Sequence, residues 1–211
     1  MNIAIIGAGN VGKALGGSST RAGHSVVFAA KDPEHAQAAA EQTGGRAAGS
    51  NREAAEAADV VVLAVPYPAV EAILDELGDA LVGKIVVDVT NPFNADYSGL
   101  AVEGTSAAEE VQRRVPGARV VKAFNTLLAS RQADPVVDGL PVDGFVAGDD
   151  ESAKKQVLEL ARSLGMRPID AGGLPMARAL EHMAFLNIAL QLRNGWPWQS
   201  AWRLVGPTSA G

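Results

Sequence analysis

The sequence predicts an α/β domain with a doubly wound, mostly parallel sheet of about eight strands, followed by a small C-terminal helical segment. Short β-branched runs alternate with longer helical patterns, which is typical of βαβ units. The 211 residues correspond to one domain, or to one domain with a small appendage. The sheet pattern ends near residue 170. We therefore expect the sheet domain to span 1–170 and a helix with a tail to span 171–211.

The expected strands are short apolar runs in which valine and isoleucine are frequent. Turn-forming residues bound them, as Gly7 does after the first run and Pro66 after the run DVVVLAV. The expected strands are Asn2–Ile6, Ser25–Ala29, Arg46–Ala48, Asp59–Val65, Lys84–Val89, Arg119–Ala123, Gly144–Ala147 and Arg167–Asp170.

The expected helices occupy the longer segments between these strands, and several have recognisable start signals. Pro33 suits a first helical position, Asn51 is a candidate N-cap, and Ser106 opens a capping-box pattern. The segment Ala95–Thr105 has no period and is expected to be an irregular loop. The expected helices are Val11–Ala22, Pro33–Gln42, Arg52–Ala58, Val70–Leu77, Ser106–Val115, Glu151–Leu164 and Leu174–Arg193.

The last expected helix, Leu174–Arg193, is apolar on more than one side. A helix that is apolar all round is normally buried, and little chain remains to cover this one. We therefore expect it to form a homodimer interface. The tail after it holds Trp196, Trp198 and Trp202, which we expect to anchor the tail or a subunit contact rather than to bind substrate.

Composition excludes several classes of function. The net charge is −6, which argues against a nucleic-acid surface, and the absence of cysteine excludes a thiolate zinc site and a cysteine nucleophile. The three histidines lie too far apart to indicate a metal site. The N-terminus lacks the basic region of a signal peptide, and no apolar run approaches about 20 residues. We expect a cytoplasmic protein with no membrane, metal or nucleic-acid partner.

A glycine-rich loop carries the strongest functional signal. Gly7-Ala8-Gly9-Asn10-Val11-Gly12 matches G-x-G-x-x-G, follows an expected strand and opens an expected helix. In this context Gly7 permits the tight turn, Gly9 lets a pyrophosphate approach the backbone, and Gly12 lets the helix pack on the strand. The free N–H groups at the helix start then bind the phosphates. The motif predicts a Rossmann dinucleotide site, with Asn10 and Val11 beside the phosphates.

The end of the second expected strand decides between NAD and NADP. An NAD site usually places an acidic residue there to bind the ribose 2′-hydroxyl, whereas this chain has Ala29-Ala30 followed by Lys31. A lysine attracts a 2′-phosphate. Asp32 comes one residue later and leaves NAD open, but the sequence favours NADP(H), with Lys31 at the phosphate.

Several longer motifs are distributed along the chain. They are NIAIIGAGNVGKAL at the start, LAVPY at 63–67, VVDVTNPF at 86–93, VVKAFNT at 120–126, GDDESAKK at 148–155 and IDAGGLPMAR at 169–178. Together these motifs resemble the coenzyme F420-dependent NADP oxidoreductases and the cytosolic domain of the STEAP metalloreductases. The resemblance covers nearly the whole chain and weakens in 94–105, 129–143 and the tail.

The resemblance implies hydride transfer between NADPH and coenzyme F420, or a flavin such as FMN or FAD, with no catalytic side chain because the cofactors carry the chemistry. It places the nicotinamide and the small-molecule redox acceptor at the carboxyl ends of the strands, and the loop Gly172–Leu174 near the acceptor. Besides the loop and Lys31, it implies cofactor contacts at Ala30, Val65, Pro66, Tyr67, Asn91, Pro92, Ala123, Phe124 and Asn125.

Three alternatives remain open from the sequence. The stretch Lys122–Asn125 is more typical of the metalloreductase-like relatives, which leaves a ferric or flavin reductase possible. An imine or hydroxyacid reductase shares the first motif, although its long C-terminal helical domain has no room here. A non-catalytic NADP-binding module also fits, because hydride transfer leaves no signature side chain.

Overall fold

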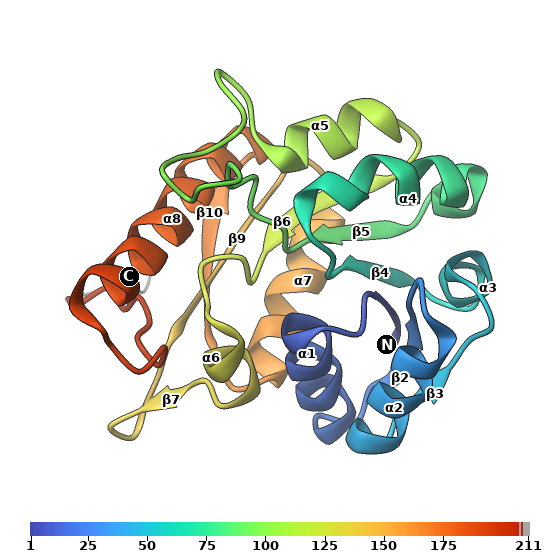
Figure 1. Ribbon diagram of the computed structural model, residues 1–211, viewed down its shortest axis with the longest axis horizontal. Coiled ribbons are helices and arrows are strands. Elements are labelled where there is room, and N and C mark those ends of the chain that lie inside the picture. Colours follow the sequence, from blue (N-terminus) through green and yellow to red (C-terminus); the bar gives the residue numbers. More distant parts are fainter. Residues whose placement is uncertain (207, 209–211) are drawn as a thin grey trace.

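A computed structural model describes residues 1–206 and 208 of the chain. Its centre is an eight-stranded sheet with helices on both faces (Figure 1), which confirms the expected doubly wound α/β class. The strand order is β10-β9-β6-β5-β4-β1-β2-β3. The strands are β1 (Asn2–Ile6), β2 (Ser25–Ala29), β3 (Arg46–Ala47), β4 (Val60–Leu63), β5 (Ile85–Asp88), β6 (Arg119–Ala123), β9 (Asp143–Gly148) and β10 (Arg167–Gly172).

All the helices except α6 agree with the expected segments to within a few residues. They are α1 (Asn10–Arg21), α2 (Pro33–Thr43), α3 (Asn51–Glu56), α4 (Val70–Leu77), α5 (Ala107–Arg114), α6 (Ala129–Ala133), α7 (Glu151–Ser163) and α8 (Ala177–Asn194). One expected cap is wrong: Ser50, not Asn51, accepts the hydrogen bond from the Glu53 N–H and caps α3. Ser106 caps α5 as expected.

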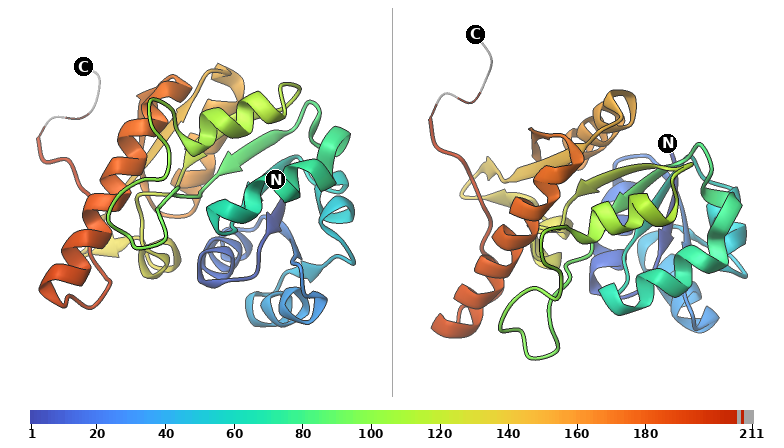
Figure 2. Two further views of the ribbon diagram at one scale, coloured as in Figure 1. Left: turned by 45° about the horizontal axis from the view of Figure 1, so that its top comes forward. Right: turned by 90° about the horizontal axis from the view of Figure 1, so that it is seen from above.

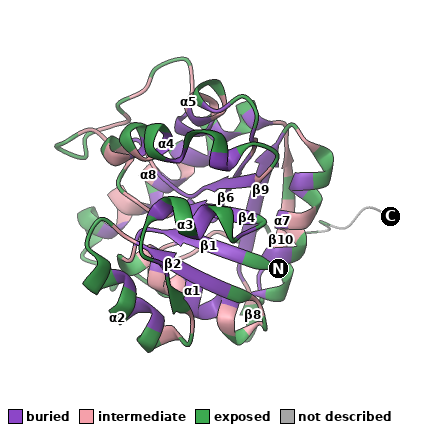
Figure 3. Ribbon diagram, turned by 90° about the vertical axis from the view of Figure 1, so that its right-hand side faces the viewer, coloured by how far each residue is buried: buried purple, intermediate pink, exposed green. Residues whose placement is uncertain are grey.

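The two faces of the sheet bury separate apolar clusters because side chains alternate along each strand. Ile3 and Ile5 of β1 lie in one cluster with residues of α1, α2 and α7. Ala4 and Ile6 lie in the other with residues of α3, α4 and α5. The inner strands are buried almost throughout, the outermost strands β3 and β10 are not, and the helices show exposed outer sides (Figure 3). The core therefore consists of two apolar layers, one on each face of the sheet.

The strands β9 and β10 run opposite to the rest of the sheet. Every other neighbouring pair is parallel, but β6 and β9 pair antiparallel, with Lys122 opposite Ala147. The sheet is thus mostly parallel, as expected, while the sequence pattern gave no indication of where the reversal occurs. Its consequence is that β10 ends at the opposite edge of the sheet from β6, so that α8 returns across the sheet toward the carboxyl edge of β1, β4, β5 and β6 (Figure 2).

Three short elements between β6 and β9 were not expected from the sequence: α6, β7 (Val136–Val137) and β8 (Leu140–Pro141). Each is too short to give a recognisable periodicity. The expected irregular segment is confirmed, since the chain between β5 and α5 contains only an isolated bridge between Phe93 and Leu100.

The helix α8 has an unusual distribution of polarity. A 3₁₀ turn over Leu174–Met176 precedes it, where one continuous helix was expected. Its buried face carries Glu181, Asn187 and Gln191, whereas Leu186 is 48% and Leu192 59% exposed. Burial on all sides is therefore wrong for the single chain. The division into 1–170 and 171–211 stays a prediction.

The tail after α8 runs back along the molecule in extended form. Its contacts include hydrogen bonds of the backbone: the carbonyl of Trp198 accepts from Ser130 Oγ at 2.6 Å, and that of Trp202 accepts from the Asp143 N–H at 3.1 Å. In the described part of the chain, no helix is both long and apolar enough to cross a membrane.

Candidate functional site

Two cavities meet at the carboxyl edge of the parallel strands. One has a volume of about 590 Å³ and is lined by Gly9, Asn10 and Val11 among others. The other, of about 660 Å³, is lined by Gly7, Ala30 and Lys31. Val65 and Pro66, which follow β4, line both. The two cavities together extend across the loop between β1 and α1, where open α/β sheets bind their ligands.

The three motif glycines differ in what an added side chain would meet. A Cβ on Gly7, whose φ is +114°, would lie 2.2 Å from the carbonyl oxygen of Ala64, and one on Gly12 would lie 2.0 Å from that of Gly7. A Cβ on Gly9 would meet no atom within 4 Å. Gly7 and Gly12 are thus required by the fold, whereas Gly9 leaves open space at the start of α1, where a bound group can reach the backbone.

The end of β2 presents a cation to the second cavity. Lys31 is exposed and lines this cavity. The side chain of Asp32 accepts a hydrogen bond from the Glu34 N–H at 2.9 Å and caps α2. Because Asp32 is engaged in this cap, the positive charge of Lys31 is the side-chain charge best placed to meet an anionic group.

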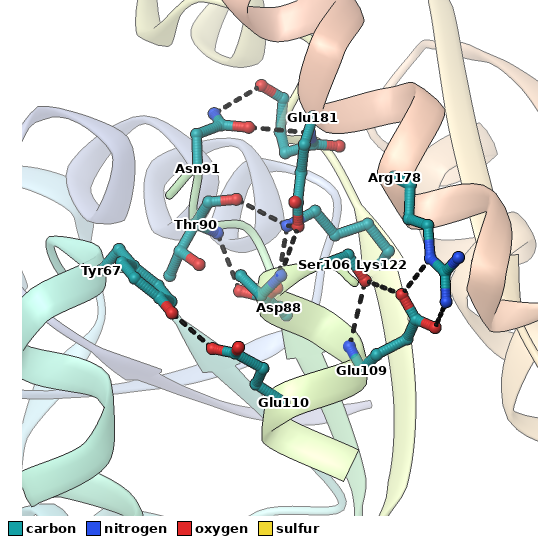
Figure 4. A network of polar contacts seen from close by, with 12 residues as sticks. Tyr67, Asp88, Thr90, Asn91, Ser106, Glu109, Glu110, Lys122, Arg178 and Glu181 are labelled. Atoms are coloured by element: carbon teal, nitrogen blue, oxygen red, sulfur yellow. Dashed lines mark hydrogen bonds and ion pairs between the residues drawn. The ribbon is translucent and has the colours of Figure 1, made fainter. Parts of the chain in front are cut away.

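The ends of β4, β5 and β6 bring polar side chains to the first cavity. Tyr67, Asn91 and Asn125 all line it. The amide groups of Asn91 and Asn125 are joined, since Asn125 Nδ2 donates to Asn91 Oδ1 at 2.9 Å and Asn91 Nδ2 donates to the Asn125 carbonyl at 3.1 Å. This pair fixes the two loops relative to each other (Figure 4).

Four of the expected contact residues do not line either cavity: Gly12, Pro92, Ala123 and Phe124. All four are buried. Phe124, with φ of +63°, packs into the apolar cluster of α1 and α7, and its carbonyl accepts from Gln132 Nε2. Ala123 and Phe124 therefore shape the loop that carries Asn125, and their side chains do not reach the cavity.

The loop Gly172–Leu174 is also displaced from its expected position. It follows β10, which runs antiparallel to β6. It therefore lies at the edge of the sheet where β6 begins, opposite the carboxyl ends of the parallel strands. There the Leu174 N–H donates to Asp149 Oδ1 at 2.7 Å, and none of its residues lines the first cavity. The helix that follows supplies Ala184, Asn187 and Ile188 to that cavity instead.

The first cavity is bordered by buried polar atoms that have no hydrogen-bond partner among the described residues. Such orphaned atoms are costly in a protein interior unless a ligand or water satisfies them. They come from four residues that line the cavity: Thr90 Oγ1, Asn125 Oδ1, Thr126 Oγ1 and Asn187 Nδ2. This wall fits a ligand with several hydrogen-bonding groups.

Behind the first cavity lies a fully buried ionic cluster (Figure 4). Lys122 Nζ contacts Asp88 Oδ2 at 2.8 Å and Glu181 Oε1 at 2.7 Å, and none of the three side chains is exposed. Lys122 also donates to the carbonyl of Thr90 at 2.6 Å. The cluster thus ties β6 to the loop after β5 and to α8, and the last two contribute residues to the cavity lining.

The carboxylate of Glu181 also connects α8 to a helix start. Its Oε1 accepts a hydrogen bond from the Ala107 N–H, in the first turn of α5, at 3.0 Å. Burial raises the pKa of Glu181 above its ordinary value, and the nearby carboxylate of Asp88 adds to this, although Lys122 opposes it. The protonated form of Glu181 is therefore more favoured here than in water.

Tyr67 is held from the opposite side by α5. Its hydroxyl donates a short hydrogen bond to Glu110, and the ring lines the first cavity. Burial together with the Glu110 carboxylate raises the pKa of Tyr67. On the same helix Glu109 binds Arg178 of α8 at 2.6 Å, so α5 is joined to both walls of the site (Figure 4).

Sequence reasoning missed Lys122, Glu181 and Asn187 as parts of this site. One signal was present, because Lys122 interrupts the apolar run VVKAF, and a charge in a buried strand needs a partner. The partner could not be identified, since Glu181 lies 59 residues along the chain.

The sequence of this chain is similar to a family model and to several proteins of known name. Residues 2–92 match the family model described as NADP oxidoreductase, coenzyme F420-dependent. The F420-dependent NADP reductase of Methanothermobacter marburgensis is 35% identical, covering 92% of this chain and 94% of that protein. Metalloreductase STEAP3 of Rattus norvegicus is 32% identical over 92% of this chain, but the match spans only 37% of that protein.

Solved structures show the same relationships. A crystal structure from Arthrobacter sp. FB24, provisionally assigned as an F420-dependent NADP reductase, superimposes with a TM-score of 0.85 at 32% identity and covers 94% of this chain and 97% of that one. A reductive aminase from Aspergillus terreus superimposes with a TM-score of 0.70 over 92% of this chain and 63% of that one. At 18% identity, this second similarity shows the fold alone.

Proposed function

The chain belongs to the coenzyme F420-dependent NADP oxidoreductase family, and we propose from this that it transfers hydride between NADP(H) and a deazaflavin or flavin ring. The observation that carries the proposal is the pair of cavities that share Val65 and Pro66. One end of this pair has the open backbone at Gly9 and the cation of Lys31, and the other has unpartnered polar side chains. These features suit a dinucleotide with a second ring beside it.

The dinucleotide fits the first part of this site. The N–H groups at the start of α1, with Gly9, Asn10 and Val11, hold the pyrophosphate. Lys31 pairs with the 2′-phosphate that distinguishes NADP from NAD. Val65, Pro66 and Tyr67 then border the path of the dinucleotide toward Asn91 and Asn125.

The chemistry itself belongs to the bound rings: the nicotinamide supplies a hydride, and the acceptor ring takes up that hydride and one proton from water. The residues of this chain contribute distance and orientation, which in favourable cases lower a barrier by roughly 7–11 kcal/mol. The Lys122 cluster serves this purpose, because it fixes the loop at Thr90 and Asn91 relative to α8. No side chain is assigned as an acid or base.

A binding titration followed by a turnover screen tests the proposal. We expect NADPH to bind more tightly than NADH, and the absorbance of NADPH to fall when oxidised F420, FMN or FAD is added. Ferric chelate is included because the relative from Rattus norvegicus is named a metalloreductase. Reduction of ferric chelate alone favours that second candidate. NADPH binding with no turnover of any acceptor leaves only a non-catalytic binding module.

We also propose that the protein is a homodimer. The support is the exposure of two leucines of α8 in the single chain, Leu186 at 48% and Leu192 at 59%. Sedimentation of the purified protein tests this, and a single species with the mass of one chain contradicts it. The cytoplasmic location expected from the sequence stays a prediction, which cell fractionation checks.

A further inference from the structure

We propose that the side-chain amide of Asn187 donates a hydrogen bond to a ring carbonyl oxygen of the electron acceptor, and so helps to select it. The inference rests on the proposed function, and it assigns a specificity-determining residue to the acceptor side of the site. Asn187 lies in α8, lines the first cavity and is 4% exposed.

The orientation of the Asn187 amide follows from a chain of hydrogen bonds that starts at a backbone group. The N–H of Trp198 can only donate, and it lies 2.9 Å from Gln191 Oε1. This contact fixes the oxygen of Gln191 and turns its Nε2 toward Ser200 Oγ, at 2.7 Å, and Asn187 Oδ1, at 3.3 Å. The atom of Asn187 that faces an NH₂ group must be its oxygen.

Ser200 completes the assignment. Its hydroxyl accepts from Gln191 and donates to Asn187 Oδ1 at 2.6 Å. The oxygen of Asn187 is therefore engaged twice, and the planar amide has one orientation. Its other arm, Nδ2, is buried and has no partner among the residues that the structure describes. An unpaired buried donor is costly, so this N–H group is suited to a hydrogen-bond acceptor on a molecule bound in the cavity.

The position of α8 indicates which molecule supplies this acceptor atom. The helix packs next to β9, where Leu180 contacts the cluster of Phe145 and Ala147. In the sheet order β9 is separated from β1 by β6, β5 and β4, so α8 lies far from the second cavity with Lys31 (Figure 1). A dinucleotide held at Lys31 and Gly9 reaches the first cavity with its nicotinamide, and the second ring lies on the α8 side.

The chemistry of the donor narrows the acceptor class. Deazaflavin and flavin rings carry carbonyl oxygens on their pyrimidinedione edge, which accept hydrogen bonds in the plane of the ring. A ferric chelate offers no such edge. Asn187 therefore favours a flat heterocycle with ring carbonyl groups over a chelated metal ion.

The experiment compares Asn187→Asp with Asn194→Asp. The first substitution keeps the shape of the side chain and the accepting arm, but replaces the free N–H group by an oxygen that repels a carbonyl. Asn194 is an exposed asparagine on the same helix, with its amide bonded to the Leu190 carbonyl, so it controls for added charge on α8. Ser200→Ala is the second variant, because it disturbs the orientation of Asn187 from outside the cavity.

For Asn187→Asp we expect kcat/KM for oxidised F420 or FMN to fall about tenfold or more, the effect of losing roughly 1.4 kcal/mol. The Kd for NADPH should stay within about twofold of wild type, and any ferric chelate reduction should be unchanged. Ser200→Ala should give a smaller loss in the same direction, and Asn194→Asp none. A structural role alone would lower all the activities together.

Two results overturn the inference. One is an equal weakening of NADPH and acceptor, which assigns the amide to the nicotinamide. The other is unchanged kinetics in both site variants. If wild type turns over no acceptor, the proposed function fails by itself. The inference is then tested by titrating FMN and F420 into the complex with NADP⁺, which measures ring affinity without turnover. Equal ring affinity in wild type and Asn187→Asp, or no ring binding to either, overturns it.

Discussion

The ammonium group of Lys122 lies 2.7 Å from Oε1 of Glu181, and neither side chain has any surface exposed to water. Asp88 lies on another side of the same ammonium group at 2.8 Å. Two carboxylates thus share one cation inside the protein. Because burial of uncompensated charge is costly, the cluster makes specific predictions about which of its members can be replaced.

Replacement of the cation is expected to be the most damaging change. Lys122→Met leaves Asp88 and Glu181 buried without a counter-ion, and should lower the free energy of unfolding by about 3–5 kcal/mol in denaturant titrations. The double variant Lys122→Met with Glu181→Gln should recover part of this loss, since it leaves one uncompensated carboxylate. A loss under about 1 kcal/mol in the single variant would contradict the role of Lys122.

The raised pKa of Glu181 predicts a pH dependence of stability. Between the ordinary pKa of 4.5 and the raised value, the folded chain holds a proton that the unfolded chain has released. Stability therefore falls as pH rises through this window. Glu181→Gln lacks the titration, so wild type should lose stability relative to the variant as pH rises above 4.5, up to the raised pKa. Denaturant titrations from pH 4 to pH 8 measure the difference, and a constant difference argues against a raised pKa.

Substitutions at two of the motif glycines should have different effects, one on NADPH binding and the other on stability. Gly9→Ala adds a methyl group in open space, so stability should be unchanged while NADPH binding weakens about tenfold, or roughly 1.4 kcal/mol. Gly12→Ala places its methyl group against the Gly7 carbonyl and should cost about 1–3 kcal/mol of stability. Calorimetric titration and thermal unfolding of both variants measure this, and normal NADPH affinity in Gly9→Ala would move the phosphates elsewhere.

Reversal of charge at Lys31 should change the preference for NADPH. Lys31→Glu replaces an attraction to the 2′-phosphate by a repulsion, so the Kd for NADPH should rise by about tenfold or more while that for NADH changes little. Added salt should reduce the effect, because Lys31 is exposed. Equal changes in both affinities would mean that Lys31 does not contact the 2′-phosphate.

Much of the fold could be predicted from local patterns, because the strands and the glycine loop have signals within a few residues. The reversal at β9 could not, since Gly144–Ala147 reads as a buried strand in either direction. Because of that reversal, Gly172–Leu174 does not lie near the acceptor, where it was expected from the sequence. The resemblance also did not separate Asn125, which lines the cavity, from its neighbours Ala123 and Phe124, which are buried behind it.

The polar buried face of α8 could not be predicted from the sequence for a related reason. The leucines of Leu174–Arg193 suggest a buried apolar helix, whereas Glu181, Asn187 and Gln191 occupy the inner side. Composition cannot show which side faces inward when the buried side chains are satisfied by distant partners. Partners from elsewhere in the chain, among them Lys122 and Ser200, make this face compatible with the interior.

The helix α8 is held by hydrogen bonds at two points, and residues of the tail provide one of them. Glu181 is held by Lys122 and Ala107, and Gln191, ten residues later, is held by Trp198 and Ser200. At 1.5 Å per residue the two points are about 15 Å apart, with Asn187 between them. Sliding by one turn would break both. Shortening or editing the tail near Ser200 would therefore alter the active site from a distance, although none of the tail residues that the structure describes lines its cavity.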